Sequence, residues 1–164
     1  MSTTKEETTA IIIETPKGSR NKYKYDGKKK IFKLHKILPA GFAFPFDFGF
    51  IPDTKGEDGD PLDILLITQE TTFTGCHVDC RIIGGIKAIQ TEKDGEELRN
   101  DRFFAVPECD TIYDAIQGME DLSQELVDAI TNFFIAYRKY EGASYKPVSM
   151  LTADEVKELI KAAS

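Results

Sequence analysis

The sequence predicts a mainly β fold, a small five-stranded barrel flanked by C-terminal helices. Segments with strand-like patterns fill the chain up to about residue 107, and helical spacing of apolar residues appears only after residue 120. No internal repeat or low-complexity linker interrupts this order. With 164 residues, 41% hydrophobic and 30% charged, we expect a single domain over 1–164, with 1–9 flexible.

The first predicted strands form a hairpin. In "NKYKYDGKKKIFKL", Asp26-Gly27 separates two alternating segments, which predicts a two-residue turn. The following "GFAFPFDFGFIP" carries Phe at every second position from Phe42 to Phe50, so an extended chain would have one aromatic face. Pro45 and Gly49 argue against a regular strand. We expect an irregular extended segment whose rings cover the core or line a cleft.

The remaining predicted strands are more apolar. "DILLI" is typical of a short buried strand, and "HVDCRIIGGIKAIQ" of a longer one that bends at Gly84-Gly85. A hairpin around Asp94-Gly95 then leads into "LRNDRFFAVP".

Two helices are predicted after the strands. Asp121 and Gln124 resemble a capping box, and Gly142 is suited to end the helix. Its apolar residues recur at helical spacing: Leu122, Leu126, Ile130, Phe133 and Tyr137. A second capping box, Thr152 with Glu155, opens a terminal helix with Val156, Leu159 and Ile160 facing inward.

Composition argues against several classes of protein. The net charge of −7 is unfavourable for general nucleic-acid binding, and no apolar run reaches the roughly 18 residues of a membrane span. The N-terminus lacks a signal-peptide pattern, so we expect a cytoplasmic protein. Cys76, Cys80 and Cys109 fit neither a zinc site nor a redox motif, even with His77 between the first two, and are interpreted as structural.

Charge is distributed unevenly along the chain. From Lys17 to Lys36 there are nine basic residues and one acid, Asp26. A basic limb followed by an acidic loop is expected where a polyanion is held against divalent cations. The alternative is a solvated hairpin whose lysines protect an edge strand.

The acidic loop "EDGDPLD" places four carboxylates within seven residues, immediately before a buried strand. A calcium EF-hand loop is excluded, because Asp63 stands where Gly is required and Gln69 where Glu is required. A solvated turn and a hard-metal site that grips phosphate oxygens both remain open.

These residues carry a family resemblance. "DGDPLD", preceded by "FGFIP" and followed by an apolar strand, is similar to the signature of the family I soluble inorganic pyrophosphatases. "IETPKGSRNKYKYD", "AVP" and "FFIAYRKYEG" occur in the family's order. The resemblance implies an OB-type barrel, a homo-oligomer (hexamer or trimer), and hydrolysis of pyrophosphate with Mg²⁺, or alternatively Mn²⁺.

The resemblance also implies residue roles. Asp58, Asp63 and the outer Glu14 would bind metal, and Asp60 would accept a proton from the attacking water. Asn100 stands at a further metal-ligand position. The substrate-binding positions correspond to Lys22, Lys36, Arg102, Tyr137 and Arg138.

Several site positions depart from the family pattern. Lys24 replaces Glu, Phe48 replaces Tyr, Asn100 replaces a metal-binding Asp, and Gln90 or its neighbour replaces another. Lys36, Arg102 and Arg138 are Lys/Arg exchanges, which keep the charge but alter the phosphate grip.

Fewer anionic ligands should weaken the binding of divalent cations. Asp101 is not a simple substitute, because in a strand it faces away from the side of Asn100. Asp94, Glu96 or Glu97 would restore the charge if the longer hairpin folded back.

Two functions follow. The first is Mg²⁺-dependent hydrolysis of pyrophosphate, which the retained Asp58, Asp60 and Asp63 favour. The alternative is a catalytically impaired homologue that acts as a phosphate-binding or interaction module, which Gln90 and Asn100 favour. A nucleotide or other phosphoester hydrolase is a third interpretation, based only on the altered phosphate-binding positions.

Overall fold

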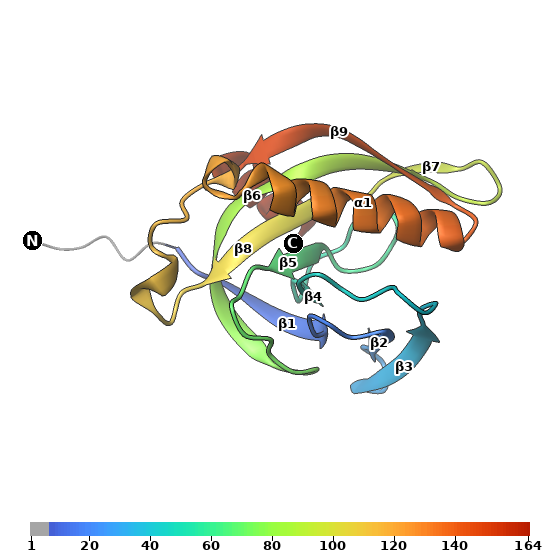
Figure 1. Cartoon of the computed structure of the whole chain (residues 1–164), viewed down its shortest axis with the longest axis horizontal. Coiled ribbons are helices and arrows are strands. Elements are labelled where there is room, and N and C mark those ends of the chain that lie inside the picture. The colour runs from blue at the N-terminus through green and yellow to red at the C-terminus, as the bar shows by residue number, and fades with distance from the viewer. Residues whose placement is uncertain (1–6) are drawn as a thin grey trace, which may run out of the picture.

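The strands close into a ring. In the computed structural model, which describes residues 7–164, β1 (Thr9–Thr15) pairs with β4 (Asp47–Phe50), β4 with β5 (Asp63–Leu66), β5 with β8 (Arg102–Pro107), and β8 with β6 (His77–Thr91). The ring is completed by β6 pairing with β1 (Figure 1). All pairs are antiparallel except β5–β8. The predicted class, a mainly β ring of five strands, is confirmed, but its members differ from the prediction: β2 and β3 lie outside the ring. The expectation of an irregular segment is wrong for Asp47–Phe50, which forms a strand between β1 and β5. Residues 1–6 of the expected flexible segment lie outside the described residues, and Thr9 already pairs with Cys80.

Two further strands extend β6 beyond the ring. β7 (Glu97–Arg99) forms the hairpin predicted around Asp94-Gly95, and β9 (Ser144–Thr152) pairs with the same strand. β9 was not predicted from the sequence. It contains Pro147 and pairs only with β6, which leaves it as an edge strand, where a residue without an N–H group is tolerated.

β2 (Asn21–Asp26) and β3 (Ile31–Ile37) form a separate hairpin, as predicted, but the two-residue turn is wrong. Asp26 pairs with Ile31, so four residues make the turn. The Asp26 carboxylate accepts hydrogen bonds from the backbone N–H groups of Lys28 and Lys29, at 3.0 and 3.1 Å, and Lys30 adopts a positive φ of 56°. The side chain of Asp26 therefore organises a longer turn than the Asp-Gly pair suggests.

Two α-helices follow the ring, α1 (Gln124–Tyr140) and α2 (Ala153–Ala163), with short 3-10 turns η1 (Thr111–Tyr113) and η2 (Met119–Asp121) before them. The predicted cap of α1 at Asp121 is wrong, because Ser123 Oγ accepts from Leu126 N. Asp121 instead accepts from two backbone N–H groups before η2. Gly142, with φ of 79°, follows the C-cap residue of α1, and Thr152 with Glu155 caps α2, both as predicted.

The central strands are buried on both faces. Alternate residues of β5 and β8 contribute to two apolar clusters: Leu65 and Phe104 pack with α1, whereas Ile64 and Phe103 pack with α2. Two covered faces explain the uninterrupted apolar runs of these strands. β6 changes register between Ile82 and Gly84, at the predicted bend.

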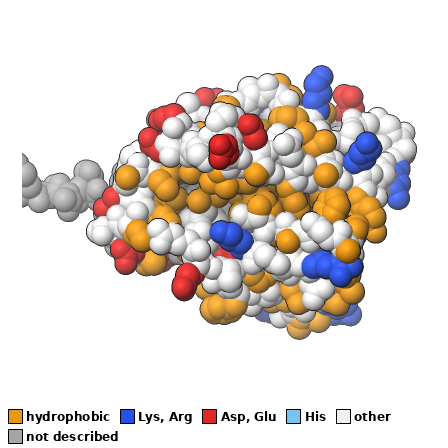
Figure 2. Space-filling model, in the orientation of Figure 1, with side chains coloured by type: hydrophobic (Ala, Val, Ile, Leu, Met, Phe, Trp, Pro, Cys, Tyr) orange, Lys and Arg blue, Asp and Glu red, His pale blue; other side chains and the backbone are white. Residues whose placement is uncertain are grey.

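The outer surface is asymmetric in charge. On the face shown in Figure 2, hydrophobic side chains form a band across the middle, acidic side chains lie mostly on the left, and Lys and Arg gather towards the right. Among residues 7–164, no helix is long and apolar enough to cross a bilayer.

Candidate active site

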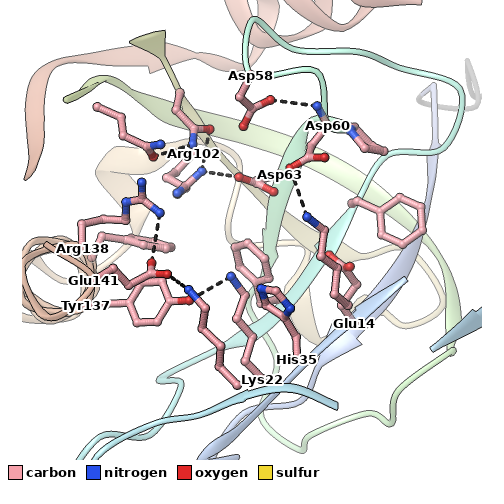
Figure 3. A pocket seen from close by; sticks show the side chains of 18 of the residues that line it. Glu14, Lys22, His35, Asp58, Asp60, Asp63, Arg102, Tyr137, Arg138 and Glu141 are labelled. Carbon is pink, nitrogen blue, oxygen red and sulfur yellow. Dashed lines mark hydrogen bonds and ion pairs between the residues drawn. The ribbon is translucent and has the colours of Figure 1, made fainter. Parts of the chain in front are cut away.

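A cavity of about 400 Å³ lies between the loop before β5, the β2–β3 hairpin and the C-terminal end of α1 (Figure 3). All ten predicted site residues line it: Glu14, Lys22, Lys36, Asp58, Asp60, Asp63, Asn100, Arg102, Tyr137 and Arg138. Segments from the beginning, middle and end of the chain therefore meet here. The aromatic segment contributes Phe44, Phe48 and Phe50 to the wall, so its rings both fill the core and line a cleft.

The acidic loop is held by its own hydrogen bonds. Thr54 Oγ1 donates to Ile51 O and accepts from Leu62 N, which joins the two ends of the loop. Within it, Asp58 Oδ1 accepts from Asp60 N at 3.0 Å, and Gly59 has a φ of 84°. These bonds fix the backbone and leave further carboxylate oxygens facing the cavity.

Two of the three aspartates are paired with cations. Asp60 Oδ2 lies 3.3 Å from Lys24 Nζ, and Asp63 forms an ion pair with Arg102. The Arg102 guanidinium also donates to Asn100 Oδ1 at 2.8 Å and lies 4.5 Å from the centre of the Phe134 ring. Arg102 is only 4% exposed, so its charge sits in the floor of the cavity.

The opposite wall is cationic. Lys22 Nζ donates to the Tyr137 hydroxyl at 2.9 Å, and Lys36 and Arg138 converge on the carboxylate of Glu141. Arg138 also pairs with Glu92 at 3.3 Å. The buried Nε atoms of Arg102 and Arg138 have no hydrogen-bond acceptor among the described residues. Anionic oxygens in the cavity would supply acceptors for such donors.

Burial raises the pKa of three carboxyl groups in the cavity, those of Glu14, Asp58 and Asp63. For Glu14 it raises the pKa to about 7, with a further increase from the charge of Asp63, although Tyr25 N donates to Glu14 at 2.8 Å. Burial also raises the pKa of Asp63, despite the opposing charge of Arg102, and that of Asp58. These carboxylates are therefore poorly compensated by the protein's own positive charge.

This donor set fits a divalent cation. Glu14, Asp58, Asp60 and Asp63 offer carboxylate oxygens, the donors that hard cations prefer, and an added positive charge would compensate their burial. In residues 7–164, no three Asp, Glu, His or Cys side chains converge into a ready-made metal site. Lys24 and Arg102 already contact one carboxylate oxygen of Asp60 and of Asp63, so a metal ion at those oxygens would compete with these two side chains.

Two of the departures from the family pattern, Asn100 and Gln90, contact each other. Asn100 Nδ2 donates to Gln90 Oε1 at 2.9 Å, which places Gln90 itself in the cavity. Asp101 points elsewhere, as predicted, and accepts from Ala88 N and Arg99 Nε. Asp94 does not line this cavity and instead accepts from Glu96 N within its own hairpin.

Sequence reasoning missed several cavity residues, among them the titratable side chains of His35, Glu92 and Glu141. Glu92 belongs to the hairpin that was expected to restore charge, but Asp94, Glu96 and Glu97 had been named instead. A signal for Glu141 was present in the sequence, because residues three and four apart share a helix face and Glu141 follows Arg138 and Tyr137 at those spacings.

Comparison with known proteins matches residues 11–164 to the family model described as "Pyrophosphatase: Inorganic pyrophosphatase". The chain belongs to the inorganic pyrophosphatase family. The inorganic pyrophosphatase of Methanosarcina acetivorans is 40% identical over 85% of this chain and 80% of its own length. That of Geobacillus stearothermophilus is 39% identical over 80% and 76%.

Solved structures agree with this assignment. The inorganic pyrophosphatase from Neisseria gonorrhoeae is 34% identical with a TM-score of 0.87, covering 95% of this chain and 88% of the other. The structure from Coxiella burnetii has a TM-score of 0.87 at 30% identity, covering 99% and 97%. The predicted fold class, a β ring of the OB type with two helices, is confirmed, as is the interpretation of this pyrophosphatase as a metal-dependent inorganic diphosphatase.

Proposed function

We propose that this pyrophosphatase hydrolyses inorganic pyrophosphate in the cavity of Figure 3, with Mg²⁺ as its cofactor and Mn²⁺ as a substitute. The observation that carries the proposal is the placement of Asp58, Asp60 and Asp63 on one wall and Lys22, Lys36 and Arg138 on another wall of the same cavity. A diphosphate has the charge for both walls, because its oxygens bind cationic side chains and cations alike. Retention of the three aspartates supports an enzyme over a binding module.

The residue roles that we propose are those that the family resemblance implies, and this placement supports them. Asp58, Asp63, Glu14 and the amide oxygen of Asn100 would hold the cation. When bound, it would lower the pKa of a coordinated water and neutralise charge on phosphate oxygens.

The protein's own groups position the reaction. Asp60 accepts the proton as the water oxygen bonds to one phosphorus, and the bridging oxygen leaves with the second phosphate. The phosphoryl oxygens are bound by Lys22, Lys36, Arg102, Tyr137 and Arg138.

The assembly and location are part of the same proposal. Large hydrophobic side chains are exposed on β3 and β9, among them Ile31, Leu34, Ile37, Val148 and Met150. We infer a homo-oligomer, a hexamer or trimer, which light scattering during size-exclusion chromatography would measure. The free cysteines Cys76, Cys80 and Cys109 suit a reducing, cytoplasmic location.

The test is phosphate release from pyrophosphate with Mg²⁺ or Mn²⁺, for the natural protein, Asp60→Asn and Asp53→Asn. Asp53 is exposed in the same loop and does not line the cavity, so it controls for loss of one negative charge. We expect Asp60→Asn to lower kcat by about 100-fold or more, the range for loss of an acid–base group. Natural protein without metal-dependent turnover, or Asp60→Asn with full turnover, would refute the proposal.

A further inference from the structure

Glu141 forms ion pairs with two of the cationic side chains that are proposed to bind phosphate, Lys36 and Arg138. It follows α1 directly, and Figure 3 shows it across the cavity from Asp60. Its carboxylate forms an ion pair with Lys36 and lies 3.0 Å from Arg138 Nη1, and its side chain is only 12% exposed. A carboxylate and a phosphate compete for the same donors, because both present anionic oxygens to them.

The position of Glu141 is unfavourable for the helix itself. The C-terminal end of a helix carries partial negative charge, so an acidic side chain there is destabilising unless cations offset it. Glu141 is the C-cap residue of α1, and the positive φ of Gly142 already allows the chain to leave the helix. An acidic side chain is therefore not needed here to end the helix. The ion pairs of Glu141 with Lys36 and Arg138 are the reason for it.

The cationic side chains of this wall differ in whether a carboxylate already pairs with them. Arg138 is also bound by Glu92, whereas Lys22 contacts the Tyr137 hydroxyl and has no carboxylate partner within residues 7–164. Burial lowers the pKa of Lys36, and the charges of Lys22 and Arg138 lower it further. Glu141 relieves this repulsion when no phosphate is bound, and a phosphate with greater negative charge would relieve it more.

We propose that Glu141 is an internal competitor for phosphate, which occupies Lys36 and Arg138 between turnovers and is displaced from them when substrate binds. This inference rests on the proposed function, because it takes these two residues as phosphate-binding groups. Return of the Glu141 carboxylate to them promotes release of product phosphate. The cost is a weaker grip on the substrate, and so a higher KM.

The test measures orthophosphate binding by titration calorimetry without added metal, for the natural protein and for Glu141→Gln, Glu141→Asp and Glu125→Gln. Glu125 is exposed in the first turn of the same helix, so Glu125→Gln removes an equal charge away from the cavity. We expect Glu141→Gln to bind orthophosphate about tenfold more tightly, the effect of losing one well-placed competing ion pair. Glu141→Asp, which is one methylene shorter, should fall between, and Glu125→Gln should match the natural protein.

Steady-state kinetics give a second readout. Glu141→Gln should have a lower KM for pyrophosphate together with a lower kcat, because product leaves more slowly. Unchanged or weaker orthophosphate binding by Glu141→Gln would overturn the inference, since Glu141 would then merely position Lys36 and Arg138. If Glu141→Gln does not fold, the same criterion applies to Glu141→Asp. Because calorimetry requires no turnover, a natural protein without pyrophosphatase activity would refute the proposed function separately.

Discussion

Lys24 Nζ lies 3.3 Å from Asp60 Oδ2, so a lysine of β2 contacts the carboxylate that we assign as the proton acceptor. Both side chains are about half exposed, at 47% and 56%. Such a pair contributes about 0–1 kcal/mol to folding. Its main effect is on the site, because it places a fixed positive charge where a divalent cation would approach.

Replacing Lys24 should therefore favour the metal. We expect Lys24→Met to bind Mn²⁺ about threefold more tightly, since one repulsive charge is removed, and to leave the melting temperature nearly unchanged. Calorimetric titration with Mn²⁺ measures the affinity. Lys33→Met is the matched control, because Lys33 lies opposite Lys24 in the hairpin and outside the cavity. Equal affinities in both variants would contradict the assigned role of Lys24.

Asn100 offers a second test of the metal site. Its side chain joins Arg102 to Gln90, so Asn100→Asp adds a negative charge beside the proposed ligand Asp63. We expect Mn²⁺ affinity to rise about five- to tenfold, because affinity for hard cations increases with ligand charge. The exposed Asn132 of α1 supplies the control variant, Asn132→Asp. An unchanged Mn²⁺ isotherm in Asn100→Asp would place the cation away from this end of the cavity.

The bend of β6 depends on Gly84, whose φ is 151°. A Cβ atom there would lie 2.5 Å from Met119 Cγ and 2.7 Å from Leu151 O. We expect Gly84→Ala to lower the free energy of unfolding by about 2–3 kcal/mol, through overpacking and backbone strain. Urea unfolding measures this change. Gly27→Ala, in the open turn of the β2–β3 hairpin, should change stability by less than about 1 kcal/mol.

Cys80 predicts an alkaline loss of stability. Burial raises the pKa of its thiol to about 12, whereas an unfolded cysteine titrates near about 8.5. Between these values the folded state holds a proton that the unfolded state releases, so the free energy of unfolding falls as pH rises. The slope approaches about 1.4 kcal/mol per pH unit. Urea unfolding of the natural protein and Cys80→Ala, between about pH 8 and 11, should show a smaller alkaline loss in the variant. Parallel curves would disprove this contribution.

Much of the fold could be predicted from local pattern. The apolar runs of β5 and β8, the bend at Gly84 and the Thr152 cap each depend on neighbours in the sequence, and the structure confirms them. The errors arose where competing local signals were present. Asp121 and Ser123 are both residue types that cap helices, and the structure uses Ser123 for α1. Pro147 is unfavourable within a strand, but the edge position of β9 beside β6 accommodates it.

The site was predictable as a set of residues but not as a set of partners. The ten predicted residues all line one cavity. Composition alone marked only the acidic loop and the basic limb, and the family resemblance supplied the full set of site residues. Their pairing depends on distant contacts. Glu92 reaches Arg138 across 46 positions and Lys36 reaches Glu141 across 105, and no local pattern encodes such distances.

The 15-residue strand β6 pairs with β1, β7, β8 and β9. β6 therefore joins the ring to both β7 and β9. No strand that pairs with β6 can separate far from it without exposing the amides at the centre of β6. We expect those amides to exchange hydrogen with solvent only through global unfolding, and the β2–β3 hairpin, which belongs to another sheet, to exchange much faster. The β2–β3 hairpin, which carries Lys22 and Lys36 of the cationic wall, would then be the most mobile part of the cavity. The ring of strands that supports it would move as one body.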